Sequence, residues 1–320
     1  MSVIFTLRRN VWTVPAGGSG PQDHGNGFTL EGDNGAAVVL VHGLTGTPNE
    51  MRFIATYLNR KGYTVICPRL ANHGEPLSVL KKTRWQDFYA SVREVMTGKR
   101  VTGNPGPVYT GGLSMGALLA LLAADEFRER VAGVSCLATT LFYDGWNTPG
   151  AKYFMPLACT PLKNFFYFKE EPPYGVRNEA IRNRIHRYYA NATLDRMDNV
   201  AQYGYPFFPV TQLYQLQLLV RHLTRRLGRI RTPVQLIQAK DDDMTSVKNS
   251  KFVYDRIGSE TKEMIFLYNS YHVITVDQER ETVAEKMGAF FGRLRACGGA
   301  VIARHREAGP KQSIDGAPAS

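Results

Sequence analysis

The 320-residue sequence has no long hydrophobic run. The longest candidate, residues 117–124, is followed at once by two acidic residues, whereas a spanning helix needs about 20 predominantly apolar residues. This pattern excludes an integral membrane protein. The N-terminus also lacks the order of a secretory signal, because the apolar residues 3–7 precede Arg8 and Arg9. We therefore expect a cytoplasmic protein.

Cysteine is scarce, and its spacing is not that of a metal site. The four cysteines, Cys67, Cys136, Cys159 and Cys297, share no CxxC pattern. Two of them lie in strand-like apolar runs, where a reduced thiol behaves as a small hydrophobic group. The pattern argues against a disulfide framework or a zinc site and fits a reducing compartment.

Acidic residues are too few to balance the basic ones, and the formal net charge is +11. The excess is local, because residues 151–232 contain 13 Lys or Arg against 5 Asp or Glu. Basic surfaces attract nucleic acid, anionic membranes or acidic ligands. These residues are scattered singly, without a zinc-finger or RGG signature, so we expect no nucleic-acid partner. A solvated basic face is the simplest interpretation; peripheral contact with an anionic membrane and acceptance of an anionic substrate stay open.

The remaining composition is that of an ordinary globular protein, with 43% hydrophobic and 21% charged residues. Short β-branched runs alternate with helical patterns, which indicates an α/β fold with a mostly parallel sheet and helices on both faces. The predicted strands cover residues 38–41, 63–67, 107–110, 131–137, 234–239 and 264–268.

The predicted helices begin at polar capping residues. Thr47, Pro48 and Glu50 have the spacing of a capping box, which predicts a helix over residues 51–61. Further helices are predicted from Thr83 to Met96, over residues 117–128, from Ser246 towards Gly258 and from Asp277 towards Arg295.

One long segment departs from the alternation. Residues 141–231 show no strand alternation and are rich in Phe, Tyr and Pro. Insertions at the carboxyl edge of an α/β sheet commonly cover the ligand crevice, so we predict a largely helical cap. The α/β core would then comprise residues 36–140 and 232–297, with a partly mobile leader over 1–35 and a mobile tail over 298–320.

A G-x-S-x-G pentapeptide, residues 112–116, lies between a predicted strand and a predicted helix. This is the setting of a nucleophile elbow, with Ser114 as the nucleophile. A side chain at Gly112 or Gly116 would collide with the neighbouring strand or helix. The helix N-terminus would favour the negative charge that develops during attack. A serine at an ordinary helix start is the alternative.

A serine hydroxyl needs a base, and the base needs a carboxylate, in the chain order Ser, acid, His. Asp241, Asp242 and Asp243 directly follow a predicted strand, and His272 lies between the last strand and the last helix. We choose Asp242 as the acid, although the sequence barely separates the three. A solvated acidic turn and a surface-loop histidine are the alternatives.

The oxyanion of a tetrahedral intermediate needs two donors. The backbone N–H groups of Leu44, in the loop after the first core strand, and of Met115, after the nucleophile, are the candidates. His42 and His73 are expected to brace loops. A metal site is a poor interpretation, because no close pair of ligands is present.

Together these motifs resemble the α/β-hydrolase superfamily, and more narrowly the small bacterial carboxylesterases and monoacylglycerol lipases. The resemblance covers about residues 38–294 and rests on residues 40–48 (LVHGLTGTP), 68–74 (PRLANHG), 112–116 (GLSMG) and 269–277 (NSYHVITVD). It implies a serine ester hydrolase acting on monoacylglycerols or short to medium acyl esters. The family's nucleophile, acid and base fall on Ser114, Asp242 and His272, and no cofactor or metal is implied.

Two other functions stay open. An acyltransferase would use the same three residues under a cap that excludes water. A non-catalytic binding protein could share the scaffold, since a fold does not determine a function. The sequence predicts no oligomeric state.

Overall fold

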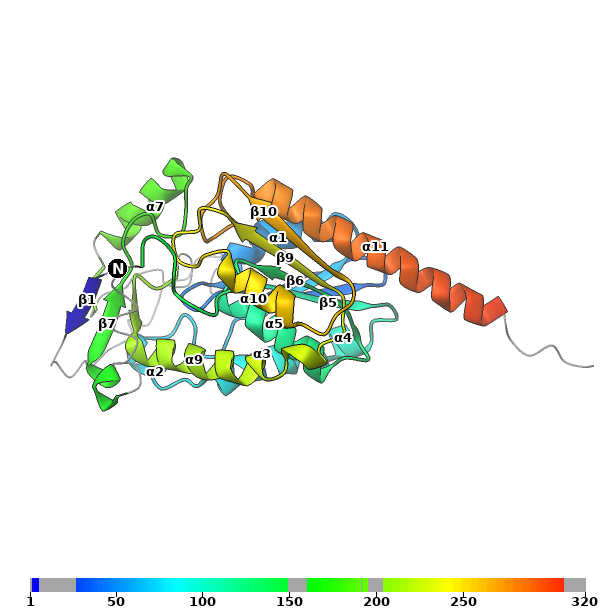
Figure 1. Ribbon diagram of the computed structural model, residues 1–320, viewed down its shortest axis with the longest axis horizontal. Coiled ribbons are helices and arrows are strands. Elements are labelled where there is room, and N and C mark those ends of the chain that lie inside the picture. The colour runs from blue at the N-terminus through cyan, green and yellow to red at the C-terminus, as the bar shows by residue number, and fades with distance from the viewer. Residues whose placement is uncertain (1, 6–26, 149–159, 191, 195–203, 308–320) are drawn as a thin grey trace, which may run out of the picture.

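The computed structural model describes residues 2–5, 27–148, 160–190, 192–194 and 204–307 (Figure 1). Its centre is a seven-stranded sheet in which only the edge strand β2 runs antiparallel to its neighbour. Across the sheet the order is β10 (Lys262–Leu267), β9 (Val234–Ala239), β6 (Val131–Leu137), β5 (Val108–Leu113), β3 (Ala37–Val41), β4 (Thr64–Cys67) and β2 (Phe28–Leu30). The predicted, mostly parallel sheet is confirmed.

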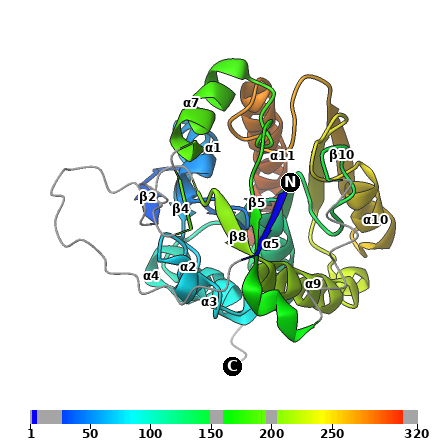
Figure 2. The same ribbon diagram turned by 90° about the vertical axis from the view of Figure 1, so that its left-hand side faces the viewer.

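Helices cover both faces of this sheet, as expected (Figure 2). One face is covered by α1 (Arg52–Asn59) and α11 (Arg280–Glu307). The other is covered by α3 (Trp85–Thr97), α5 (Met115–Glu126), α9 (Val210–Thr224) and α10 (Lys248–Arg256). The shorter helices are η1 (Pro48–Met51), α2 (Leu77–Leu80), α4 (Lys99–Thr102), η2 (Pro161–Phe165) and η3 (Leu227–Arg229).

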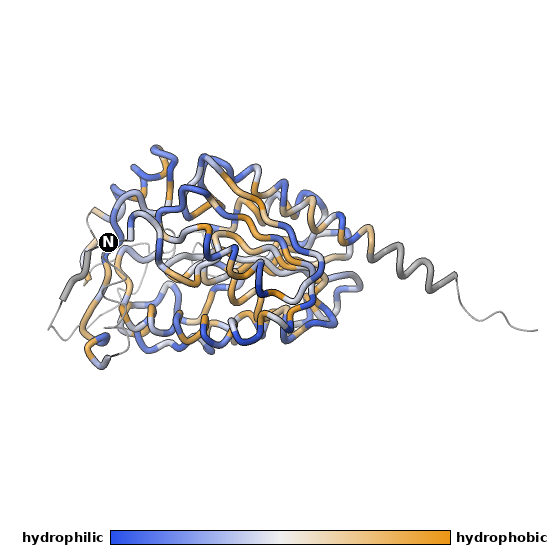
Figure 3. The backbone as a smooth tube through the Cα atoms, in the orientation of Figure 1, coloured by the Kyte–Doolittle hydropathy of each residue, from blue (hydrophilic) through white to orange (hydrophobic). Residues whose placement is uncertain are grey.

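The hydrophobic core lies on the two sides of the central strands (Figure 3). Strands β3 and β5 are buried along their whole length, as expected where helices cover both faces of a parallel sheet. Helix α5 is apolar on nearly all sides and buried from Met115 to Asp125. It therefore forms a rigid support directly behind Ser114.

The segment predicted as a cap contains strands that the sequence analysis missed. Strand β7 (Phe166–Lys169) pairs with β1 (Ser2–Phe5) and with β8 (Phe207–Pro209) in a small antiparallel sheet. Figure 1 shows this sheet and α7 (Glu179–Tyr189) at the end of the molecule opposite to the end of α11. Helix α9 also belongs to this segment, yet it packs against α3 and α5. The division into core and cap stays a prediction.

Two details differ from the expected helix ends. Thr47 makes no side-chain capping hydrogen bond, and the carboxylate of Glu50 accepts instead from the amide of Gly43. The predicted capping box is therefore wrong. Helix α11 continues to Glu307, beyond residue 297 where the tail was expected to begin.

Cys67 and Cys136 are buried free thiols in β4 and β6, and Cys297 is exposed and free. Cys159, residues 6–26 of the predicted leader and residues 308–320 of the predicted tail lie outside the described residues. Within the described residues, none of the helices has the length and apolar character required to cross a membrane.

Candidate active site

Ser114 lies in a sharp turn between β5 and α5. Its backbone has φ 59° and ψ −117°, a conformation that is costly for a residue other than glycine and that is found at functional sites. A Cβ atom on Gly112 would lie 2.3 Å from the carbonyl of Gly116, and one on Gly116 would lie 2.2 Å from the carbonyl oxygen of Val41. The two glycines are thus required for close packing of helix, turn and strand, as predicted.

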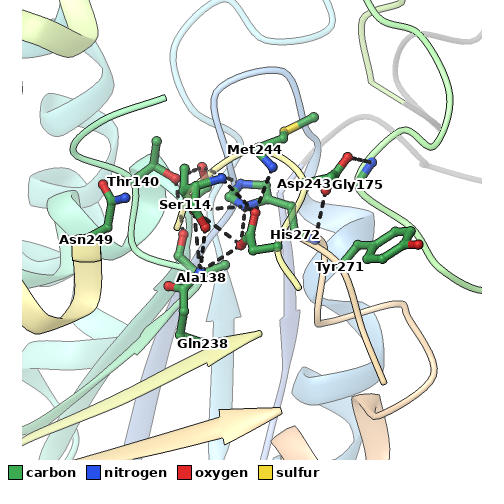
Figure 4. Close-up of polar contacts among 12 residues, drawn as sticks. Ser114, Ala138, Thr140, Gly175, Gln238, Asp243, Met244, Asn249, Tyr271 and His272 are labelled. Carbon is green, nitrogen blue, oxygen red and sulfur yellow. Dashed lines mark hydrogen bonds and ion pairs between the residues drawn. The ribbon is translucent and has the colours of Figure 1, made fainter. Parts of the chain in front are cut away.

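The structure brings Ser114 and His272 together (Figure 4), and Asp242 contacts the other nitrogen of the same imidazole ring. His272 Nε2 lies 3.0 Å from Ser114 Oγ, and His272 Nδ1 lies 2.9 Å from Asp242 Oδ2. All three residues are buried. Because Nδ1 faces a carboxylate, the neutral imidazole carries its proton there and offers Nε2 to the serine hydroxyl.

Asp242 is held in place by several donors. Its Oδ1 accepts from the amides of Met244 and Thr245 at 2.9 and 2.8 Å, and its Oδ2 accepts from Gln238 Nε2 at 2.7 Å. Asp241 is instead exposed and lies 3.4 Å from the guanidinium of Arg177. Of the three consecutive acids, only Asp242 thus contacts the imidazole ring through its side chain.

Opposing effects determine the pKa of His272. Burial alone would lower it, but the carboxylate of Asp242, through charge and hydrogen bonding, raises it, with smaller contributions from Asp243 and Glu50. The net pKa lies above the ordinary value of 6.5. The ring is therefore a stronger base than a free histidine, as general-base catalysis near neutral pH requires.

Thr140 also touches the serine, and the sequence carried no signal for it. Its hydroxyl lies 2.8 Å from Ser114 Oγ and 3.2 Å from the carbonyl oxygen of Ala138. Thr140 follows β6, the strand next to β5. Its hydroxyl therefore helps to orient the serine side chain.

The predicted oxyanion loop lies beside these residues. Leu44, Ser114 and His272 line the same small cavity of about 60 Å³, and Met115 is the first residue of α5. The first amides of a helix have no partner within the helix, so the amide of Met115 is suited to bind an anion. The oxyanion role of Leu44 and Met115 remains a prediction.

Both histidines that were expected to brace loops contact this loop. His73 Nε2 lies 2.8 Å from the carbonyl oxygen of Leu44. His42 Nδ1 lies 2.9 Å from the carbonyl oxygen of Gly43, and its Nε2 accepts from the amide of Leu70. Burial lowers the pKa of both rings, so they are neutral braces near pH 7.

Two carboxyl groups that the sequence analysis did not assign to the site line the same small cavity. Glu50 accepts from the amide of Gly43, and Glu170 accepts from Thr45 Oγ1 at 3.0 Å. Burial raises the pKa of each to about 7. Among the described residues no group of three His, Cys, Asp or Glu side chains is arranged to hold a metal ion.

A larger cavity of about 960 Å³ adjoins the small one. Both cavities are lined by Thr45, Gly46, Glu50, Glu170, Tyr174 and Val273. The larger cavity extends from there to α7 and to the starts of α1 and α11. It has room for a substrate much larger than the reacting ester group.

Comparison with known proteins places the chain in a family. The family model described as "Serine aminopeptidase, S33" (Hydrolase_4) matches residues 32–279. The chain is 27% identical over 263 residues to a thermostable monoacylglycerol lipase of Bacillus sp. (strain H-257), covering 82% of this chain and 92% of that protein. It is 26% identical over 270 residues to a carboxylesterase of Bacillus subtilis (strain 168), covering 83% and 96%.

Solved structures agree in fold. A structure from work on LipS and LipT, two metagenome-derived lipolytic enzymes, superimposes with a TM-score of 0.69 at 26% identity, covering 84% of this chain and 98% of that one. The monoacylglycerol lipase of Paleococcus ferrophilus superimposes with a TM-score of 0.67 over the same shares, and its 16% identity supports the fold alone.

Proposed function

Because the chain belongs to the Hydrolase_4 family of serine aminopeptidase-like α/β hydrolases, we propose that it hydrolyses carboxylic esters through an acyl-enzyme on Ser114. The observation that carries the proposal is the continuous chain of contacts from Ser114 Oγ to His272 Nε2 and from His272 Nδ1 to Asp242. The names of two relatives, a monoacylglycerol lipase and a carboxylesterase, favour esters over peptides.

In the first half of the proposed reaction, Ser114 Oγ attacks the acyl carbonyl while His272 Nε2 takes the hydroxyl proton. The amides of Leu44 and Met115 stabilise the oxyanion. His272 then passes the proton to the leaving alcohol, and the acyl group stays on Ser114. Asp242 holds the imidazole orientation and stabilises the positive charge of the ring.

In the second half, water takes the place of the alcohol. His272 Nε2 accepts a proton from the water as its oxygen attacks the acyl-enzyme carbonyl. The proton returns to Ser114 Oγ as the acid leaves. The balance is one ester and one water consumed, and one carboxylic acid and one alcohol released.

The lining of the larger cavity supports a proposal for the substrate class. Its described lining includes the apolar side chains of Val176, Ile181, Ile185 and Val276, which suit an acyl chain rather than a polar peptide. We propose short to medium acyl esters, including monoacylglycerols, as substrates.

Hydrolysis of p-nitrophenyl esters from two to sixteen carbons, by wild type and Ser114→Ala, tests the proposal. Serine-dependent turnover with an optimum in chain length supports it, and a fluorophosphonate label counts active sites. Labelling at Ser114 without turnover points to the acyltransferase. Its product, the ester formed from the acyl group and an acceptor alcohol, would be sought by mass spectrometry. Neither labelling nor turnover by folded protein favours the binding protein.

A further inference from the structure

We propose that the enzyme prefers esters carrying an anionic group remote from the scissile bond, bound by Arg52, Arg184 and Arg280 at the far end of the larger cavity. This inference rests on the proposed ester hydrolysis and specifies its substrate class. The anionic group does not react; it positions the ester.

The three arginines come from three different elements. Arg52 begins α1, Arg184 lies in the middle of α7, and Arg280 begins α11, and all three line the larger cavity. Arg184 lies with Ile181 and Ile185 on the face of α7 that lines the cavity. Helices α1, α7 and α11 thus each place a positively charged side chain along the larger cavity.

Aromatic rings of the same cavity hold two of these guanidinium groups. Arg52 Cζ lies 3.8 Å from the ring centroid of Phe28, and Arg280 Cζ lies 4.7 Å from that of Phe53. Stacking on a ring orients a guanidinium group and leaves its N–H edge free to donate. Less side-chain entropy is then lost when an anion binds.

The protein contacts of these two groups leave donors for a ligand. Arg52 donates through Nε to Asn49 Oδ1 at 3.3 Å, and Arg280 forms a solvent-exposed ion pair through Nε with Glu281 Oε1 at 3.1 Å. Within the described part of the chain, no hydrogen bond or ion pair involves the side chain of Arg184. Among the described residues, the Nη groups of all three are therefore left to donate to an anionic ligand.

Charge is separated along the cavity. The carboxyl groups that line it, Glu50 and Glu170, lie at the end shared with Ser114 and His272, whereas the arginines line the larger cavity alone. Since burial raises the pKa of each carboxyl to about 7, both are only partly ionised at neutral pH. Even this partial negative charge disfavours an anion beside the serine, whereas the arginines favour an anion where they line the larger cavity.

The shape of the donors specifies the anion. A guanidinium group binds two oxygens of a carboxylate or a phosphate through parallel hydrogen bonds. The ligand is therefore an ester with a carboxylate at the end of its acyl chain or with a phosphate on its alcohol part. The apolar wall between the arginines and the serine accommodates the intervening chain.

The first arm of the test compares p-nitrophenyl monoesters of dicarboxylic acids with p-nitrophenyl alkanoates of the same chain length. The measured quantity is the ratio of kcat/KM for the anionic to the neutral ester. We expect a ratio above one in wild type, lowered about tenfold to a hundredfold in each of Arg52→Gln, Arg184→Gln and Arg280→Gln, since hydrogen bonds to charged groups have about this strength. Added salt should lower the wild-type ratio.

Two matched variants control this arm. Arg187 lies on α7, is exposed and does not line the cavity, so Arg187→Gln should keep the wild-type ratio. Arg280→Lys retains the charge but not the planar donor edge, and its ratio should lie between those of wild type and Arg280→Gln. If Arg280→Gln fails to fold, Arg52→Gln and Arg184→Gln still decide the question.

The second arm compares 1-acylglycerol 3-phosphate with the 1-acylglycerol of the same chain. If the ratio exceeds one only in the first arm, the anion belongs to the acyl chain. If the ratio exceeds one only in the second arm, the anion belongs to the alcohol part. Ratios of one or less in both arms, or ratios unchanged in all three arginine variants, overturn the inference. If no ester is hydrolysed at all, the proposed function fails instead.

Discussion

The carboxylate of Asp243 accepts a hydrogen bond from the backbone amide of His272 at 3.3 Å. Its other oxygen accepts from the amide of Gly175 at 3.2 Å, and the carbonyl oxygen of Gly175 accepts from the amide of Val273 at 2.7 Å. Gly175 belongs to the segment between β7 and α7. The loop that carries the proposed base is thus tied to the segment predicted as a cap.

A second carboxylate strengthens this connection. Asp277 accepts from the amides of Arg177, Asn178 and Tyr271, each at 2.8 Å. Asp243 and Asp277 therefore each accept hydrogen bonds both from the segment before α7 and from the loop around His272. A disturbance of the segment predicted as a cap should reach the proposed catalytic base directly.

Gly175→Ala tests this coupling. Gly175 has φ +71°, and an added Cβ would lie 2.7 Å from Val273 Cγ2 and 3.3 Å from His272 Cβ. We expect kcat to fall about tenfold to a hundredfold, because small displacements of a catalytic group are costly. In Gly228→Ala, the new Cβ would meet nothing closer than 4.0 Å, and that variant should keep wild-type kcat. A fully active Gly175→Ala would refute the coupling.

Asp242→Asn should lower kcat by about four orders of magnitude, as the equivalent change does in serine proteases, because the imidazole would be held in the wrong tautomer. Asp241→Asn should change kcat less than threefold, since Asp241 contacts Arg177 at the surface. Steady-state kinetics on one p-nitrophenyl ester measures both. The assignment of Asp242 would be wrong if the two variants lost similar activity.

The pH dependence of kcat/KM should report His272. The reaction needs the neutral ring, and the pKa of His272 lies above 6.5 because Asp242 outweighs burial. Activity should therefore fall with decreasing pH, with a midpoint above 6.5. In Asp242→Asn the main effect that raises this pKa is lost, so the midpoint of the residual activity should move to lower pH. An unmoved midpoint would show that another group titrates.

Glu50 should act by positioning the oxyanion loop. Its carboxylate accepts from the amide of Gly43, the residue before Leu44. Glu50→Leu leaves this amide unpaired, which costs about 1 to 3 kcal/mol, and kcat should fall about tenfold or more. Glu50→Gln keeps an acceptor oxygen and should retain more kcat than Glu50→Leu. Equal losses in the two variants would argue for a role of the charge rather than of the hydrogen bond.

Glu170 should make stability depend on pH. Burial raises its folded pKa from 4.5 to about 7, so the folded state holds this proton more tightly than the unfolded state. The associated stability, on the order of 3 kcal/mol, is present below pH 4.5 and is lost as pH rises through about 7. The difference in Tm, Glu170→Gln minus wild type, should therefore be larger at pH 8 than at pH 5. A difference in Tm that is the same at both pH values would contradict this.

Much of the molecule follows from local patterns. The strand runs alternate with helices, and the pentapeptide around Ser114 predicts its own turn, because Gly112 and Gly116 are required where backbone approaches backbone. The chain order Ser, acid, His then predicted a basic histidine after the last strand and an acid after the strand before it. Each of these features depends on neighbours in sequence or on a general rule of the fold.

The features that the sequence did not reveal depend on contacts between distant segments. Glu50 has the spacing of a capping box with Thr47, yet its carboxylate binds the amide of Gly43, seven residues away. The aromatic run of β7 has no period that distinguishes a strand from a helix, and its pairing with β1 spans about 160 residues.

The sequence by itself therefore determined the sheet, the elbow, the candidates Ser114 and His272 and an acid among residues 241–243, because short-range spacing and chain order specify them. The tertiary structure, by contrast, shows that the side chain of Asp242 contacts the imidazole ring. Only the tertiary structure decided how Asp243 joins His272 to the segment predicted as a cap and which arginines share the large cavity. Hydrogen bonds and charges act between atoms that folding brings together, and no local pattern records which distant residues those will be.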